Sequence, residues 1–219
     1  AGRRPPRRDP LAEVPATEVR TDIQGLRAVA VLLVLLFHLW PNQLRGGYVG
    51  VDVFFVISGY LITSHLVRNP PSRVGDIGRF WARRIRRLLP ASLLVIVATV
   101  CAAVLVLPAT QLAALARDAM SSTFYVLNWT LAVNAVDYLG ATQAPSPLQH
   151  YWSLGVEEQF YLLWPIVIAG LAWIASRRVS HAMAIGVGLF GTVFLAVSIA
   201  WTAVAPAFAY FATPTRLWE

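Results

Sequence analysis

Residues 21–63, TDIQGLRAVAVLLVLLFHLWPNQLRGGYVGVDVFFVISGYLIT, decide the fold class that this sequence predicts. The stretch is long and apolar, yet it contains Arg27, His38 and Asp52 where a membrane segment would be expected to carry apolar residues. At ~100° and ~1.5 Å per residue, Arg27 and His38 lie on nearly the same face of one helix, about 16 Å apart along its axis. Ionisable groups inside a membrane are costly, so this pair is a candidate for function.

The composition of the whole chain supports a membrane protein. The sequence is 57% hydrophobic and 13% charged, whereas soluble domains are nearer half apolar and about a quarter charged. Five apolar runs have about the ~20 residues that a helix needs to cross a bilayer, and they lie near 25–41, 48–67, 89–107, 152–175 and 183–205. The sequence therefore predicts an all-α fold, a polytopic transmembrane helix bundle with five clear spans.

Two further segments complete the expected organisation. Residues 1–20 are rich in Arg and Pro and lack apolar periodicity, so we expect a disordered basic cytoplasmic tail. The weakly amphipathic stretch 119–139 is expected to be an interfacial or re-entrant helix. Residues 21–219 would then form one transmembrane domain. Because the chain stops directly after an aromatic, Pro-broken segment, we expect that this domain is incomplete and that its bundle continues beyond Glu219.

Arginine accounts for every basic charge, and the net charge is +7. Fifteen of the eighteen arginines lie in the N-terminal segment, in the first turns of the first span (Arg27), between the second and third spans, or between the fourth and fifth spans. Because Lys and Arg concentrate on the cytoplasmic side of membrane proteins, this distribution predicts a cytoplasmic N terminus. It also explains the basic charge without nucleic-acid binding. Arg27 would lie near the inner surface and His38 near the outer one.

The strongest basic cluster is the segment SRVGDIGRFWARRIRRLLPA between the second and third spans. Arg79, Arg83, Arg86 and Arg87 have the spacing of one helix face. One interpretation is that these charges only orient the protein in the membrane. The other is a cytoplasmic site for a phosphate-rich ligand, because a guanidinium group can form two parallel hydrogen bonds to the oxygens of one phosphate. The sequence leaves both interpretations open.

The fourth span carries two adjacent carboxylates below an aromatic membrane-surface belt. His150, Tyr151 and Trp152 form that belt, and Glu157 and Glu158 follow one to two turns later, near the expected depth of His38. Adjacent helical residues point ~100° apart, so we expect only one of the two to face the interior. Such a carboxylate can serve general-base chemistry with the imidazole, or form a structural hydrogen bond with it.

Two residues of the second span have alternative interpretations. Asp52 falls in its first turn, where it either complements the helix dipole or holds His38 by a hydrogen bond and fixes its tautomer. Ser58 is interpreted as part of a close helix-packing site rather than as a nucleophile. The sequence contains no CxxC, HExxH or Gly-Lys-Ser pattern, so we expect no metal and no permanently bound cofactor.

Several of these pieces together resemble a known family. DIQGLRAVAVLLVLLFH, GGYVGVDVFFVISGYLIT, RFWARRIRRLLPA, LQHYWSLGVEEQFYLLWP and YFATPTRLWE stand in the order typical of membrane acyltransferase family 3. That family O-acylates surface polysaccharides, peptidoglycan, glycolipids and some antibiotics. The resemblance implies a multi-pass protein of the bacterial plasma membrane. It also implies further helices and, in some members, a hydrolase-like domain after the helices.

The resemblance also implies an activity and its residues. Acyl-CoA, usually acetyl-CoA, would be the co-substrate on the cytoplasmic side, and a hydroxyl of an extracytoplasmic glycan or glycolipid would be the acceptor. His38 would be the catalytic base or would carry the acyl group, oriented by Asp52 or Glu157. Donor- or substrate-binding roles carry over to Arg27, Arg83, Arg86, Arg87, Gln159, Tyr161 and Arg216.

Two other functional classes remain as alternatives. A transporter or flippase could use the same polar lining to move a polar substrate without acyl chemistry, although no inverted repeat is visible in the sequence. A structural or assembly subunit would not need the charges of Arg86 and Glu157.

Overall fold

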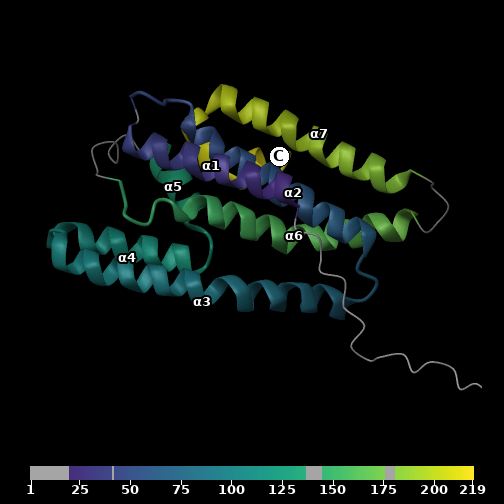
Figure 1. Cartoon of the computed structure of the whole chain (residues 1–219), viewed down its shortest axis with the longest axis horizontal. Coiled ribbons are helices and arrows are strands. Elements are labelled where there is room, and N and C mark those ends of the chain that lie inside the picture. The colour runs from purple at the N-terminus through teal and green to yellow at the C-terminus, as the bar shows by residue number, and fades with distance from the viewer. Residues whose placement is uncertain (1–19, 41, 137–144, 176–180) are drawn as a thin grey trace, which may run out of the picture. The chain divides into compact units, whose positions relative to one another are not determined.

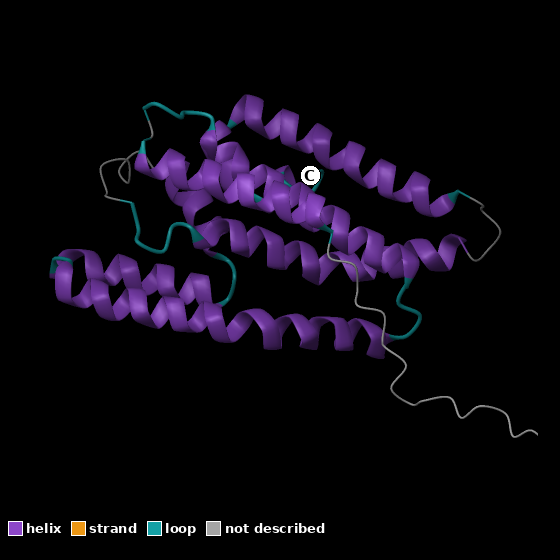
Figure 2. Ribbon diagram, viewed as in Figure 1, coloured by secondary structure: helices purple, strands orange, loops and turns teal. Residues whose placement is uncertain are grey.

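The structure is a computed structural model that describes residues 20–40, 42–136, 145–175 and 181–219. Every regular element in these residues is a helix (Figure 2). The chain divides into two compact units, residues 1–53 and 54–219, with the boundary inside one helix. Residues 1–19 of the predicted tail and the arginines at 177 and 178 lie outside the described residues.

The first unit is a long helix with a tight turn packed against it. Helix α1 (Thr21–Leu39) is followed by the 3-10 turn η1 (Gly47–Val49) and the start of α2 (Gly50–Arg68). A Cβ at Gly47 would lie 2.5 Å from the Leu33 carbonyl oxygen, and one at Gly50 would lie 2.5 Å from that of Ala30. Glycine is therefore required at both positions, because any side chain would push the turn away from α1.

The second unit contains the rest of α2 and six further α-helices. They are α3 (Val74–Val106), α4 (Ala109–Thr123), α5 (Leu127–Val136), α6 (Tyr151–Ala175), α7 (Ala182–Val204) and α8 (Pro206–Phe211), followed by the turn η3 (Thr213–Thr215). Helices α3 and α4 lie side by side and antiparallel (Figure 1). Pro70 and Pro71 separate α2 from α3, and Pro108 precedes α4, because proline disfavours helix in the residue before it.

Helix α6 is the central element of this unit because it belongs to both hydrophobic clusters. One cluster joins α6 to α2 and α3 through Tyr161, Trp164 and Phe80, with side chains of α7 packed on it. The other joins the start of α6 at Tyr151 to α3, α4 and α5. Polar groups reinforce the packing: the Trp164 indole donates to Thr63 Oγ1 on α2 at 2.8 Å. Residues of α6 therefore face several different helices.

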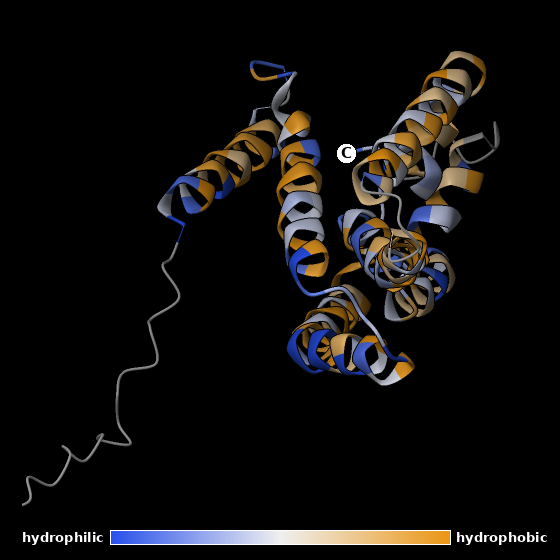
Figure 3. Ribbon diagram, turned by 90° about the vertical axis from the view of Figure 1, so that its right-hand side faces the viewer, coloured by the Kyte–Doolittle hydropathy of each residue, from blue (hydrophilic) through white to orange (hydrophobic). Residues whose placement is uncertain are grey.

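Five helices of the described chain are long and apolar enough to cross a membrane. They are Thr21–Leu39, Gly47–Arg68, Val74–Val106, Tyr151–Ala175 and Ala182–Val204. Many large apolar side chains on them are exposed, including Leu105, Val106 and Val204, and Figure 3 shows apolar residues along much of each helix. Exposed apolar surface on this scale suits contact with lipid. The predicted all-α, polytopic bundle is confirmed.

Two details differ from the sequence prediction. The arginine-rich segment and the third span form one continuous helix, α3, whose start is capped by the Asp76 carboxylate, which accepts hydrogen bonds from the backbone N–H groups of Ser72 and Arg73. The stretch expected as one helix over 119–139 is broken between α4 and α5, where Tyr125 has a positive φ of 56°. The last residues of that stretch lie outside the described chain.

Candidate functional site

In the first unit, α1 carries the ionisable residues Arg27 and His38. The helix is continuous from Thr21 to Leu39, so Arg27 and His38 keep the rise of about 16 Å expected between them. His38 Nδ1 lies 2.8 Å from the Val34 carbonyl oxygen. A carbonyl can only accept a hydrogen bond, so Nδ1 is the donor, and in the neutral form of such a ring Nε2 keeps its lone pair.

In the second unit, the Glu157 carboxylate on α6 receives two hydroxyl groups on a single oxygen. Its Oε1 accepts hydrogen bonds from Ser58 on α2, at 2.7 Å, and from Tyr161 one turn along α6, at 2.5 Å. Ser58 is therefore more than a small packing residue, because it links α2 to this carboxylate.

A small cavity of about 30 Å³ adjoins Glu157. Its walls combine apolar side chains with Glu157, Ser58 and polar groups of the C-terminal segment, namely Arg216 and Glu219. A site needs about 10–15 Å³ to hold one water molecule. The cavity therefore has room for a group of very few atoms beside the carboxylate.

Glu158, the next residue, points to a different helix. Its Oε1 lies 3.6 Å from a terminal guanidinium nitrogen of Arg84 on α3, and both side chains are largely buried, with exposed fractions of 16% and 22%. The Arg84 guanidinium also lies over the Tyr161 ring, 3.2 Å from its centre. The expectation that only one of the two carboxylates faces inward is wrong, because α2 contacts Glu157 and α3 contacts Glu158.

Gln159, the third residue in this run, belongs to a separate polar network. Its amide nitrogen donates to the Tyr125 carbonyl at 2.7 Å and to Asn128 Oδ1 at 2.9 Å. Its amide oxygen accepts from the Trp129 indole at 3.0 Å and from the Thr213 hydroxyl at 2.5 Å. Four hydrogen bonds occupy the side chain of Gln159, which ties α5 and the C-terminal segment to α6. Its predicted substrate-binding role stays a prediction.

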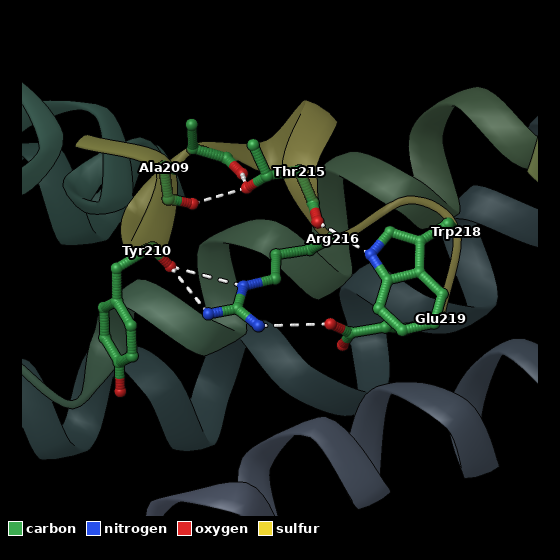
Figure 4. Close-up of polar contacts among 7 residues, drawn as sticks. Ala209, Tyr210, Thr215, Arg216, Trp218 and Glu219 are labelled. Atoms are coloured by element: carbon green, nitrogen blue, oxygen red, sulfur yellow. Dashed lines mark hydrogen bonds and ion pairs between the residues drawn. The ribbon is translucent and has the colours of Figure 1, made fainter. Parts of the chain in front are cut away.

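The C-terminal segment is held by Arg216 (Figure 4). The Arg216 guanidinium donates to the Tyr210 carbonyl at 3.2 and 3.3 Å and pairs with Glu219 at 3.1 Å. It also lies 5.2 Å from the centre of the Tyr210 ring and 5.9 Å from that of Trp152. These contacts place Arg216 on the wall of the Glu157 cavity.

A second and larger cavity lies between the end of α2 and the start of α3. It has a volume of about 390 Å³ and is lined by residues that include His65, Phe80, Arg79 and Arg83. Arg79 is neutralised by Asp76 at 2.5 Å. Arg83 is exposed and has no ion pair among the described residues, so its guanidinium is available to a ligand in this cleft.

The structure therefore sorts the predicted residues into groups. Arg27, His38 and Asp52 belong to the first unit, where the pairing of His38 with Asp52 stays a prediction. Glu157, Tyr161 and Arg216 come together at or beside the small cavity, while Arg83 lines the cleft. Arg86 and Arg87 are exposed on α3 and do not line the cleft.

The sequence interpretation missed two features of this site. Arg84 is one of five arginines within nine residues. The neighbouring sequence does not distinguish this buried arginine from the exposed ones. Tyr151 and Trp152 were expected at a membrane surface, but both are buried. The Tyr151 hydroxyl donates to the Ser92 carbonyl at 2.7 Å, and Trp152 packs on Phe55. Neighbouring helices therefore cover both residues, and their place at the depth of the membrane surface stays a prediction.

Comparison with known proteins gives a consistent result. Residues 20–214 match the family model described as an acyltransferase domain. The chain is 39% identical over 200 residues to the peptidoglycan O-acetyltransferase OatA of Listeria monocytogenes, covering 90% of this chain and 32% of the relative. It is 45% identical over 150 residues to the O-acetyltransferase OatA of Staphylococcus aureus, covering 68% and 24%.

The chain spans between about a quarter and a third of the length of these relatives. No solved structure matches it. The family match nevertheless extends over nearly all of the described helices, from the first residue of α1 to η3. On this evidence the chain is a multi-pass membrane protein that belongs to the acyltransferase domain family.

Proposed function

We propose that this chain is the membrane part of an O-acetyltransferase that moves an acetyl group from cytoplasmic acetyl-CoA to a hydroxyl of an extracytoplasmic glycan, peptidoglycan being the first acceptor to test. Its family supports an acyl transfer, and two relatives bear the names of O-acetyltransferases. The arginine distribution supports a cytoplasmic N terminus.

The observation that carries this proposal is the Glu157 carboxylate. An ionisable group within membrane helices is costly, and here it is held by two hydroxyls beside a cavity that fits only a few atoms. A purely structural carboxylate would need no adjoining space. The arrangement suits a group that orients or exchanges a proton with a small reacting centre.

The proposed chemistry uses His38 as the base. Its Nε2 accepts the proton of the acceptor hydroxyl while the hydroxyl oxygen attacks the thioester carbonyl. The new C–O bond forms, the C–S bond breaks, and the thiolate of CoA takes up a proton to leave as the free thiol. In the alternative that the sequence leaves open, His38 Nε2 first takes the acetyl group and then passes it to the hydroxyl. Glu157 or Asp52 would orient the imidazole in either case.

The donor would be bound at the cytoplasmic end of α3. The cleft beside Arg83 has the volume and the charge for a phosphate-bearing portion of CoA. Arg27 in α1 would contact the acyl-bearing arm of the donor on its way to His38. Arg86 and Arg87 would attract the anionic donor to this surface, and Arg216 would hold the C-terminal wall of the Glu157 cavity.

The decisive experiment uses the full-length protein in liposomes. Acetyl-CoA labelled in the acetyl group is supplied on one side and peptidoglycan fragments on the other. We expect labelled acetyl esters on the fragments that mild base removes, and we expect His38→Ala to abolish them at normal membrane levels. Labelled substrate that crosses without forming an ester would favour a transporter and overturn the proposal. Equal ester formation by His38→Ala would overturn the role of His38.

A further inference from the structure

Arg84 differs from the other arginines of its segment. Arg83, Arg86 and Arg87 are exposed, whereas the Arg84 side chain is only 22% exposed and faces α6. A buried guanidinium is strongly unfavourable unless it is neutralised and packed. Glu158 supplies the opposite charge and Tyr161 supplies a flat aromatic surface. Burial of this one arginine therefore needs a reason beyond orientation in the membrane.

The contacts of Arg84 favour stacking over hydrogen bonding. Its guanidinium carbon is 3.2 Å from the centre of the Tyr161 ring. The Nε atom of Arg84 and the Oε1 atom of Glu158 are both buried without a hydrogen-bond partner in the described protein. An arginine that served mainly as an ion-pair partner would be expected to form two parallel hydrogen bonds to the carboxylate. The guanidinium instead lies over the Tyr161 ring.

Stacking on Tyr161 has a consequence for the candidate site. The Tyr161 hydroxyl donates to Glu157 Oε1 at 2.5 Å, and Ser58 donates to the same oxygen. The direction of a tyrosine hydroxyl depends on the orientation of its ring, which a flat cation on one face restrains. Arg84 therefore lies one side chain away from the carboxylate that borders the small cavity.

We propose that Arg84 is a positioning residue that acts through Tyr161: its stacked guanidinium keeps the Tyr161 hydroxyl on Glu157. This inference rests on the proposed function. Arg84 also lies 6.0 Å from the centre of the Phe80 ring, and Phe80 and Arg83 line the larger cleft. One turn of α3 thus carries both the wall of the proposed donor cleft and the group that restrains Tyr161.

The test is a double-mutant cycle in the full-length protein, with kcat and the KM for acetyl-CoA measured for each variant. Arg84→Lys keeps the charge opposite Glu158 but removes the flat surface, and Tyr161→Phe keeps the ring but removes the hydroxyl. We expect each to lower kcat about tenfold with the KM changed less than about twofold. We expect the double variant to be no slower than Tyr161→Phe alone, because Arg84 then has no hydroxyl left to position.

Arg68→Lys is the matched control, since Arg68 is an exposed arginine at the end of α2 with no assigned role. It should retain wild-type kcat. If Arg84→Lys fails to accumulate, the neutral pair Arg84→Gln with Glu158→Gln replaces it, with the same expected pattern. Losses that multiply in the double variant, or a raised KM with unchanged kcat, would overturn the inference alone. An inactive wild type would overturn the proposed function as well.

Discussion

Two pairs of neighbouring charged residues, Glu157–Glu158 on α6 and Arg83–Arg84 on α3, show how adjacent positions acquire different roles. Within each pair the residue types are the same and the sequence context is nearly the same. Glu158 and Arg84 meet between the two helices and neutralise one another. Glu157 and Arg83 instead face cavities.

The difference follows from helix geometry. A step of one residue turns the side chain by ~100°, so neighbours on one helix meet different surroundings. The ion pair between Arg84 and Glu158 joins α3 to α6 and contributes to stability, and Arg84 also contacts the Tyr161 ring beside the candidate site. Glu157 and Arg83 border space that a ligand can occupy, which is where chemistry and binding are possible. Removing the charge of Arg84 or Glu158 should therefore lower stability, whereas changes at Glu157 and Arg83 should act mainly on activity and binding.

The largest effect is expected for Glu157→Gln. The amide is nearly isosteric with the carboxylate but cannot act as a base or carry its negative charge. Acetyl transfer by the full-length protein should fall by about 10²–10⁴-fold, because general-base catalysis usually contributes this much and Glu157 is proposed to orient the base, while the amount in the membrane stays normal. Ester formation on glycan fragments is the measurement. If the variant keeps more than a tenth of wild-type activity, the role of Glu157 is structural and not catalytic.

Arg84→Gln is expected to lower the free energy of unfolding, because it removes one partner of the buried ion pair between Arg84 and Glu158. It leaves the buried Glu158 carboxylate without its cation, and breaking a buried pair in this way costs about 3 kcal/mol or more. Adding Glu158→Gln should restore most of the loss. Unfolding of the detergent-solubilised protein, followed by heating or denaturant, measures both. If the double variant is as unstable as the single one, the ion pair is not what holds the helices.

Gln159→Leu extends the comparison to the third residue of the run. It would leave the Trp129 indole and the Thr213 hydroxyl without their acceptor and Asn128 Oδ1 without its donor. Buried polar groups that lose their partner typically cost about 1–3 kcal/mol. We expect that loss in unfolding free energy with little change in the KM for acetyl-CoA. A stable variant with an altered KM would instead support direct substrate binding by Gln159.

The smallest effect is expected for Arg83→Gln. Removing one exposed guanidinium from the cleft should raise the KM for acetyl-CoA about fivefold and leave kcat nearly unchanged, since phosphate contacts of this kind act mainly on binding. Arg86→Gln is the comparison, because Arg86 is exposed on the same helix but does not line the cleft. Equal effects of the two variants would mean that general charge attraction, rather than the cleft, binds the donor.

Local sequence was a good guide wherever a property depends on a single helix. The five apolar spans and the position of Arg27 and His38 on one helix could be predicted from spacing and composition. Tyr151, Trp152 and Arg84 could not be placed, because their burial depends on which helices pack against them. An aromatic residue beside a membrane surface and one beneath a neighbouring helix have the same local sequence.

The sequence by itself therefore determined that this is an all-α membrane protein of the acyltransferase domain family, since hydropathy, helix length and motif order are local properties. Only the tertiary structure decided which carboxylate faces a cavity and which forms an ion pair. That choice depends on which helix lies beside each carboxylate, since α2 contacts Glu157 and α3 contacts Glu158. The sequence specifies the type and charge of each residue, whereas the burial of its side chain and the groups it contacts depend on how the helices pack.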